Sequence, residues 1–218
     1  MIVMHLSDIH GHRGMINKIA KKAKEYSVNL IIISGDITHF GSLTEFKEIL
    51  EDIYAESKVR IFFIPGNCDP KEALDFDVSD EIKNLHDKVI KFSEFYFAGI
   101  GGALKSPLYS IISWSEDEIG KIISKLFPLP SDKLILVSHS PPYRTKVDFT
   151  KRGTHAGSKS LLKFIKKKQP RLVLVGHIHE GRGIDKIGKT IIVNSGPFKN
   201  GYAAVVSLDS HSVSLIEL

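Results

Sequence analysis

The sequence predicts an α/β fold, because strand patterns alternate with helical patterns along its first half. A continuous apolar run of mostly β-branched residues, typical of a strand buried on both faces, occupies residues 30–33, and residues 59–64 predict another buried strand. An apolar run at 1–6 predicts the first strand, and apolar residues at helical spacing lie at 15–23 and 43–54. This order predicts a parallel sheet that is covered on both faces, with right-handed crossovers.

The second half of the chain predicts more antiparallel pairing. Helical patterns occur only at 115–127 and 158–168. Ser115 is the predicted N-cap of the first of these helices, and Thr44 is the predicted N-cap of the helix at 43–54. Strands are predicted at 89–92, 95–100, 134–137, 172–175, 190–193, 202–208 and 212–216. No helical pattern separates the last three strands, and no repeat or linker divides the chain, so we expect a single domain over residues 1–218.

Composition narrows the class of protein. The 218 residues are 42% hydrophobic, which is ordinary for a globular protein, and their net charge of +5 could favour phosphate-bearing partners. No run of about 18 apolar residues predicts a transmembrane helix, and the N-terminus lacks the order of a signal peptide. The single cysteine, Cys68, fits a reducing compartment, so we expect a cytoplasmic protein without a membrane partner. The basic runs at 18–24 and 163–168 match solvated helix faces, so composition does not indicate nucleic-acid binding, and it leaves the oligomeric state open.

Metal-binding residue types follow five of the predicted strands. They are Asp8 and His10, Asp36, Asn67, His139, and His177 with His179. Core packing would select apolar residues at these positions, and turns would not select four histidines. The set suits Mn, Fe, Zn, Co or Ni rather than Ca or Mg, with Mn as our first expectation. Seven ligands fit two ions that share one carboxylate, and two ions about 3.5–4 Å apart can clamp phosphorus for in-line displacement.

The order of these motifs resembles that of the calcineurin-like metallophosphoesterases. The matching motifs are Asp8-Ile9-His10, Gly35-Asp36, Gly66-Asn67-Cys68-Asp69, His139 and Gly176-His177-Ile178-His179. The neighbouring sequence is most similar to the small prokaryotic, Icc-like branch. The resemblance implies a two-sheet β-sandwich of mixed parallel and antiparallel strands, flanked by helices on both sides.

The resemblance also implies roles for these residues. One ion would be held by Asp8, His10 and His179, and the other by Asn67, His139 and His177. Asp36 would bridge the two ions, and a bridging hydroxide would attack phosphorus.

One position departs from the family pattern. Many members have a histidine after the asparagine, which protonates the leaving oxygen, and here that position is Cys68. A thiol with an ordinary pKa near 8.5 is a poor general acid at pH 7, so we expect slower turnover that depends on the leaving group. The alternative is that Cys68 only packs. His39 and His155 are candidates for a substrate role in its place, or are otherwise surface or turn histidines.

Other polar residues have local interpretations. Asp69 and Glu180 adjoin predicted ligands and are candidates to orient Asn67 and an imidazole, or are ordinary loop acids. His5 lies inside the first strand and is predicted to be a core residue, whereas His86 is predicted to lie at the surface.

The motifs together predict a dinuclear-metal-dependent hydrolase of small phosphate esters, with phosphodiesters favoured over monoesters. Two alternatives stay open: a non-catalytic metal-binding scaffold of the same fold, and a nuclease. Specificity would come from the loops at 71–88, 101–114 and 143–157, where no readable code identifies the substrate.

Overall fold

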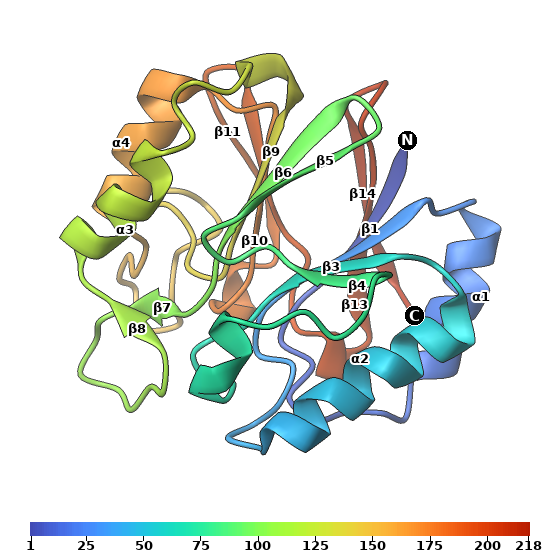
Figure 1. Ribbon diagram of the computed structural model, residues 1–218. Coiled ribbons are helices and arrows are strands. Elements are labelled where there is room, and N and C mark those ends of the chain that lie inside the picture. Colours follow the sequence, from blue (N-terminus) through green and yellow to red (C-terminus); the bar gives the residue numbers. More distant parts are fainter.

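The structure is a computed structural model that describes all residues from 1 to 218. Two six-stranded sheets stack face to face, and two helices cover the outer face of each sheet (Figure 1). Both sheets mix parallel and antiparallel pairs, which confirms the predicted α/β class and the two-sheet sandwich flanked by helices. No helix is long and apolar enough to cross a bilayer.

The first sheet carries the N-terminal parallel strands. Its order is β14-β13-β1-β2-β3-β4, in which β1 to β4 run parallel while β13 and β14 pair antiparallel at one edge. The bounds are β1 (Ile2–Leu6), β2 (Leu30–Ser34), β3 (Ile61–Ile64), β4 (Ile82–Asn84), β13 (Tyr202–Ser207) and β14 (Ser212–Glu217). The sequence did not predict β4, because three residues are too few to show a period.

The second sheet is parallel at its centre. Its order is β11-β12-β10-β9-β6-β5, and only the edge strands β11 and β5 pair antiparallel. The bounds are β5 (Val89–Phe92), β6 (Phe95–Ile100), β9 (Leu134–Ser138), β10 (Leu172–Val175), β11 (Gly183–Ile187) and β12 (Thr190–Asn194). The unpredicted hairpin strand β11 returns the chain, so β12 lies parallel to β10. The expected excess of antiparallel pairs in the second half is therefore confined to sheet edges.

Three apolar layers hold the sandwich together. Along β2, Ile31 and Ile33 pack beneath α1 (Ile16–Glu25) and α2 (Leu43–Ser57), whereas Leu30 and Ile32 face the second sheet. The outer face of the second sheet packs against α3 (Glu116–Ser124) and α4 (Lys159–Lys168). The first sheet is thus covered on both faces, as predicted, but by helices on one face and by a sheet on the other.

Serine side chains cap the N-termini of α2 and α3. The side chain of Ser115 accepts a hydrogen bond from Glu118 N in a full capping box, which confirms the predicted N-cap of α3. The prediction for α2 was wrong by two residues, because Ser42, not Thr44, accepts from Glu45 N at 3.1 Å. An extended backbone at Ser42 lets its hydroxyl reach this N–H, whereas Thr44 already lies inside the helix.

Short elements complete the chain. They are the small paired strands β7 (Ala103–Leu104) and β8 (Ser113–Trp114), and the single 3₁₀ turns η1 (Lys71–Leu74), η2 (Ser131–Lys133), η3 (His179–Gly181) and η4 (Phe198–Asn200). The last of these turns lies between β12 and β13, where the sequence predicted no helix. Most of these elements line the same end of the sandwich as the carboxyl ends of the parallel strands (Figure 1).

Candidate metal centre

The structure brings the seven predicted ligands together, although they are spread over 172 residues of sequence from Asp8 to His179. The ligand atoms of Asp8, His10 and His179 lie within 4.8 Å of one another, as do those of Asp36, His139 and His177. Asn67 joins the second group, because its Oδ1 lies 3.0 Å from His139 Nε2. The parallel strands position these residues, since the carboxyl ends of such strands meet at one edge.

The first group, Asp8, His10 and His179, has lone pairs that converge. The Nε2 atoms of His10 and His179 are 3.2 Å apart, and His179 Nε2 is 3.3 Å from Asp8 Oδ1. Asp8 Oδ1 is buried and has no hydrogen-bond partner. A buried carboxylate oxygen without a donor is costly unless a cation or proton satisfies it. The donor set therefore fits a divalent metal ion.

The second group, Asp36, Asn67, His139 and His177, contains an imidazole of fixed orientation. His139 Nδ1 donates to the carbonyl oxygen of Ser34 at 2.7 Å, which leaves Nε2 to face Asn67 Oδ1 and Asp36 Oδ1. A backbone carbonyl that holds one ring nitrogen directs the other toward a metal in many metal sites.

Asp36 lies between the two groups. Its Oδ1 is 3.5 Å from His139 Nε2, and its Oδ2 is 3.8 Å from His10 Nε2. The backbone N–H of Cys68 donates to the same Oδ1 at 2.8 Å and helps to hold the carboxylate in place. One carboxylate thus presents an oxygen to each group.

The backbone around the ligands is strained. Asp8, His10, Asp36 and His177 all adopt left-handed conformations, with φ of 54°, 50°, 50° and 67°. Such conformations cost non-glycine residues about 1–3 kcal/mol and cluster at functional sites. Gly66 permits the close approach of strand ends, because a Cβ there would lie 2.1 Å from Asp36 N.

The electrostatics favour ionised carboxylates and mostly neutral imidazoles. Burial opposes ionisation of Asp8 and Asp36, but the neighbouring histidines outweigh it and lower the pKa of both carboxyls. Burial lowers the pKa of His10 and of His177 to about 4. His139 is the exception, because Asp36 overcomes its burial and raises its pKa to about 9. Metal binding at His139 would therefore release a proton.

Cys68 is buried beside the centre. Burial, followed by the nearby Asp36 carboxylate, raises the pKa of its thiol. The thiol therefore stays protonated at neutral pH and holds its proton more tightly than an ordinary cysteine does. This environment agrees with the expectation that Cys68 is a poor substitute for a histidine acid.

His39 reaches the centre, whereas His155 does not. His39 Nδ1 lies 3.3 Å from His10 Nδ1, and the side-chain ligand atoms of His39, His10 and Cys68 are within 4.8 Å of one another. The ring of His155 instead hydrogen-bonds Asp148 Oδ1 at 2.7 Å, and none of its contacts involves a predicted ligand. Asp148 also accepts the backbone N–H groups of residues 144, 145 and 157, so it ties His155 into this loop.

The two flanking acids act on backbone rather than on ligand side chains. Asp69 is buried, and it accepts hydrogen bonds from Ile37 N, Thr38 N and Gly66 N, which joins the loops that carry Asp36 and Asn67. Burial, followed by Asp36, raises the pKa of Asp69 to about 6. Glu180 accepts a hydrogen bond from Lys151 N at 2.6 Å, which favours the alternative that it is a loop acid.

Two histidines outside the centre test the local interpretations. His5 is fully buried and shares a hydrogen bond with Ser34 Oγ at 2.8 Å, which confirms the prediction of a core residue. His86 is also buried, so its prediction as a surface residue was wrong. It stacks on Trp114 and accepts a hydrogen bond from Gly101 N at 3.0 Å, contacts that its local sequence does not reveal.

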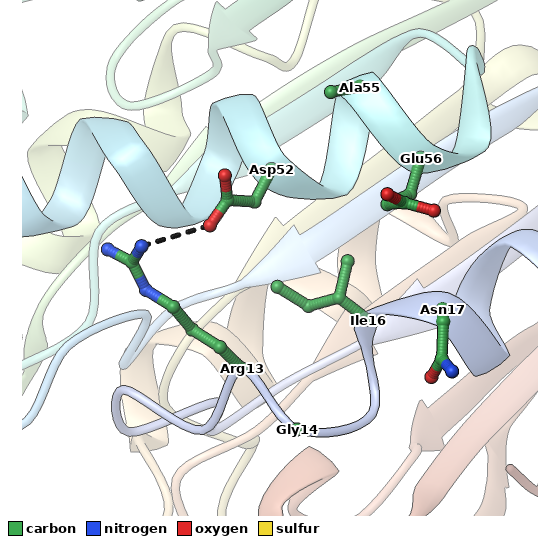
Figure 2. A pocket seen from close by; sticks show the side chains of 7 residues that line it. All are labelled: Arg13, Gly14, Ile16, Asn17, Asp52, Ala55 and Glu56. Carbon is green, nitrogen blue, oxygen red and sulfur yellow. Dashed lines mark hydrogen bonds and ion pairs between the residues drawn. The ribbon is translucent and has the colours of Figure 1, made fainter.

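A separate cavity of about 300 Å³ lies between the start of α1 and the side of α2. Figure 2 shows Arg13 and Asp52, paired at 3.0 Å, at one end and Asn17 and Glu56 at the other. None of the seven predicted ligands lines it. This cavity is therefore not part of the metal centre.

Comparisons with known proteins define the family. The sequence model of the calcineurin-like phosphoesterase family matches residues 1–181 of this chain. The chain is 36% identical, over 90% of its length, to an uncharacterized protein of Methanocaldococcus jannaschii, of which it covers 88%. This chain therefore belongs to the calcineurin-like phosphoesterase family, which supports a hydrolase of phosphoric esters with candidate ligands for divalent metals.

Two further matches are more distant. The chain is 22% identical to a probable cyclic nucleotide phosphodiesterase of Vesicomyosocius okutanii, with coverage of 81% of this chain and 73% of the relative. A solved structure of a Thermus thermophilus protein superposes with a TM-score of 0.79 at 18% identity, with coverage of 99% and 98% of the two chains. The structural match supports the fold alone.

Proposed function

We propose that the protein is a dinuclear-metal-dependent phosphodiesterase. The observation that carries this proposal is the position of Asp36, whose two oxygens face the two groups of ligands at 3.5 and 3.8 Å. Asp8, His10 and His179 would hold one ion, Asn67, His139 and His177 would hold the other, and Asp36 would serve both. When bound, such ions acidify water and neutralise charge on phosphoryl oxygens. Mn is our first choice of metal, with Fe, Zn, Co or Ni as alternatives.

The residues of the chain prepare this chemistry. The hydrogen bond from His139 Nδ1 to Ser34 fixes the ring, and the N–H of Cys68 fixes Asp36. Asp69 joins the two loops through backbone N–H groups, so Asp36 and Asn67 keep their separation. Preorganised groups of this kind stabilise a transition state without reorganisation when charge develops.

The leaving group requires a proton donor. Cys68 is poorly suited because its thiol pKa is raised. We assign the proton transfer to His39, which is exposed and lies beside His10 and Cys68 at the edge of the centre. His155 has no contact that supports the same role.

A relative of this chain supports the preference for diesters. The 22% identical relative is named a probable cyclic nucleotide phosphodiesterase. A non-catalytic scaffold has no need for a complete set of ligands, and this chain keeps all seven predicted ones, which favours the enzyme. No observation specifically favours a nuclease.

Hydrolysis of bis-p-nitrophenyl phosphate and p-nitrophenyl phosphate tests this proposal. The protein is stripped with chelator, refilled with Mn, and assayed beside Asp36→Asn and beside the surface control Asp52→Asn. We expect metal-dependent release from the diester that Asp36→Asn loses and Asp52→Asn keeps. Two bound metal equivalents without hydrolysis of either ester would favour the scaffold, and less than one equivalent would contradict the dinuclear centre.

A further inference from the structure

A row of aromatic rings leads from the metal centre to the surface. The ring of His39 lies 5.1 Å from that of His10, Phe40 lies 5.0 Å from His39, and Tyr109 lies 5.4 Å from Phe40, all measured between ring centroids. Phe40 is 43% exposed and Tyr109 is 77% exposed. The outer two rings therefore leave apolar surface uncovered next to the candidate active site.

Both outer rings are attached to the loop that carries Asn67 and Cys68. Phe40 N donates to Cys68 O at 3.0 Å, and Ile111 N, two residues after Tyr109, donates to Asn67 O at 2.9 Å. Tyr109 lies in the segment that joins β7 and β8, which projects from the body of the protein (Figure 1). The loop that carries Asn67 and Cys68 therefore contacts both the metal centre and the segments that hold the two rings.

The backbone of Phe40 is strained. Its φ is 58°, a left-handed conformation that is rare for a bulky residue. Exposure of a large apolar ring and a strained backbone both oppose folding, and neither is offset by contacts within the core. Such a feature is more consistent with ligand binding than with stability.

We propose that Phe40 and Tyr109, here called the aromatic wall, bind the base of a nucleoside phosphodiester substrate. This inference rests on the proposed function, because the phosphate of that substrate would lie at the metal centre. A planar base beyond His39 would stack on the exposed rings, whereas an aliphatic glycerol or choline group has no flat face to offer. Two rings suit one base and are too small a surface for a stable protein interface.

The chemistry of the aromatic wall also predicts its selectivity. Phe40 has no polar atom, and Tyr109 has one hydroxyl, so the wall offers little to distinguish the hydrogen-bonding edges of different bases. Every base has a π-face, and stacking on aromatic side chains is tolerant of sequence. We therefore expect the protein to distinguish nucleotides from sugar phosphates far more than one base from another.

Calorimetric titration of the Mn-loaded protein with AMP and with ribose 5-phosphate tests the inference. Both ligands carry the same sugar phosphate, and only AMP carries a base. We expect AMP to bind about 5- to 150-fold more tightly, which is the range for stacking of one base. Phe40→Leu and Tyr109→Leu should reduce this ratio severalfold, and the double variant should bring it close to one, while Tyr109→Phe keeps it.

A matched control is Phe127→Leu, because Phe127 is 38% exposed and its ring contacts Phe164 rather than the aromatic wall. It should leave the ratio unchanged. Equal binding of AMP and ribose 5-phosphate by the unmodified protein would overturn the aromatic wall and leave the phosphate site standing. Failure of both ligands to bind would overturn the aromatic wall and the phosphate site together. Because the readout is binding, absence of ester hydrolysis would contradict the proposed function separately.

Discussion

The two sheets contribute different chemistry to the candidate metal centre. The first sheet supplies every candidate oxygen ligand, namely Asp8, Asp36 and Asn67, together with His10. The second sheet supplies only the imidazoles, which are those of His139, His177 and His179. Neither sheet holds a complete ligand group, so each ion would need residues from both. The site therefore depends on how the two sheets pack.

Contacts at the centre join the two sheets directly. His139, which follows β9 of the second sheet, donates to the carbonyl of Ser34 in β2 of the first. His177 N, after β10, donates to Asp8 Oδ2 at 3.2 Å. Between the sheets lies an apolar layer that includes Phe62 and Phe97. The two ligand groups are therefore complete only when the sheets are packed together.

Asp36→Asn should have the largest effect, because one residue of the first sheet serves both ligand groups. We expect diester hydrolysis to fall by about 10²–10³-fold, in line with the loss of a principal electrostatic group. Steady-state kinetics on the Mn-loaded protein measures the loss of hydrolysis, and metal analysis measures how much Mn the variant holds. Full activity in this variant would exclude a shared role for Asp36.

A matched pair of phenylalanines tests whether the interface between the sheets controls metal binding. Phe62 is buried between the sheets, whereas Phe46 of α2 is equally buried between the helices and the first sheet. Phe62→Ala and Phe46→Ala should each lower the free energy of unfolding by about 3–5 kcal/mol. Only Phe62→Ala should also weaken Mn binding in the folded protein. Equal loss of Mn affinity in both variants would contradict the dependence on sheet packing.

His5 provides a pH test of the same interface. It alternates with Met4 and Leu6, which face the helices, so His5 faces the second sheet, and burial lowers its pKa from 6.5 to about 3. The unfolded chain binds a proton between pH 6.5 and 3 that the folded chain excludes. Stability is therefore full above pH 6.5 and falls as the pH drops toward 3.

His5→Gln removes this titration. Relative to the variant, the unmodified protein should lose roughly 1.4 kcal/mol per pH unit over that window. Urea unfolding at pH 7 and pH 5 measures the difference, with the exposed His211→Gln as the control. If the free energy of unfolding changed with pH in the same way in the unmodified protein and in His5→Gln, His5 could be protonated in the folded protein.

Cys68→His should have the smallest effect, because His39 already lies at the edge of the centre. We expect turnover of a diester with an alkyl leaving group to rise about tenfold, below the full contribution of a general acid. Turnover of bis-p-nitrophenyl phosphate should change little, since its leaving group needs no proton. An unchanged ratio between the two substrates would show that the thiol is not what limits turnover.

The sequence predicts which residues meet at the candidate metal centre, because strand ends are encoded locally. A buried apolar run followed by Asp, Asn or His marks each position, and parallel pairing then brings the positions together. The aromatic wall has no such signal, since Phe40 and Tyr109 are far apart in sequence and meet only after two loops attach to Asn67 and Cys68. His86 shows the same limit, because its burial depends on stacking against Trp114.

Two of the four edge strands of the large sheets, β4 and β11, were also missed for a physical reason. Residues of β4 and β11 cover short stretches at the ends of their sheets, where polar side chains interrupt any apolar pattern. The stacking of two sheets came from the family resemblance rather than from periodicity. An apolar strand buried by a helix and one buried by another sheet have the same composition.

The close approach at Gly66 limits where this centre can be transplanted. A protein engineer who copied only the seven ligands onto another sandwich would leave a side chain where a Cβ meets Asp36 N at 2.1 Å. The strand ends would then separate, and Asp36 would no longer present one oxygen to each ligand group. The smallest portable unit is therefore the ligand set together with this glycine, a position that no inventory of metal-binding side chains would include.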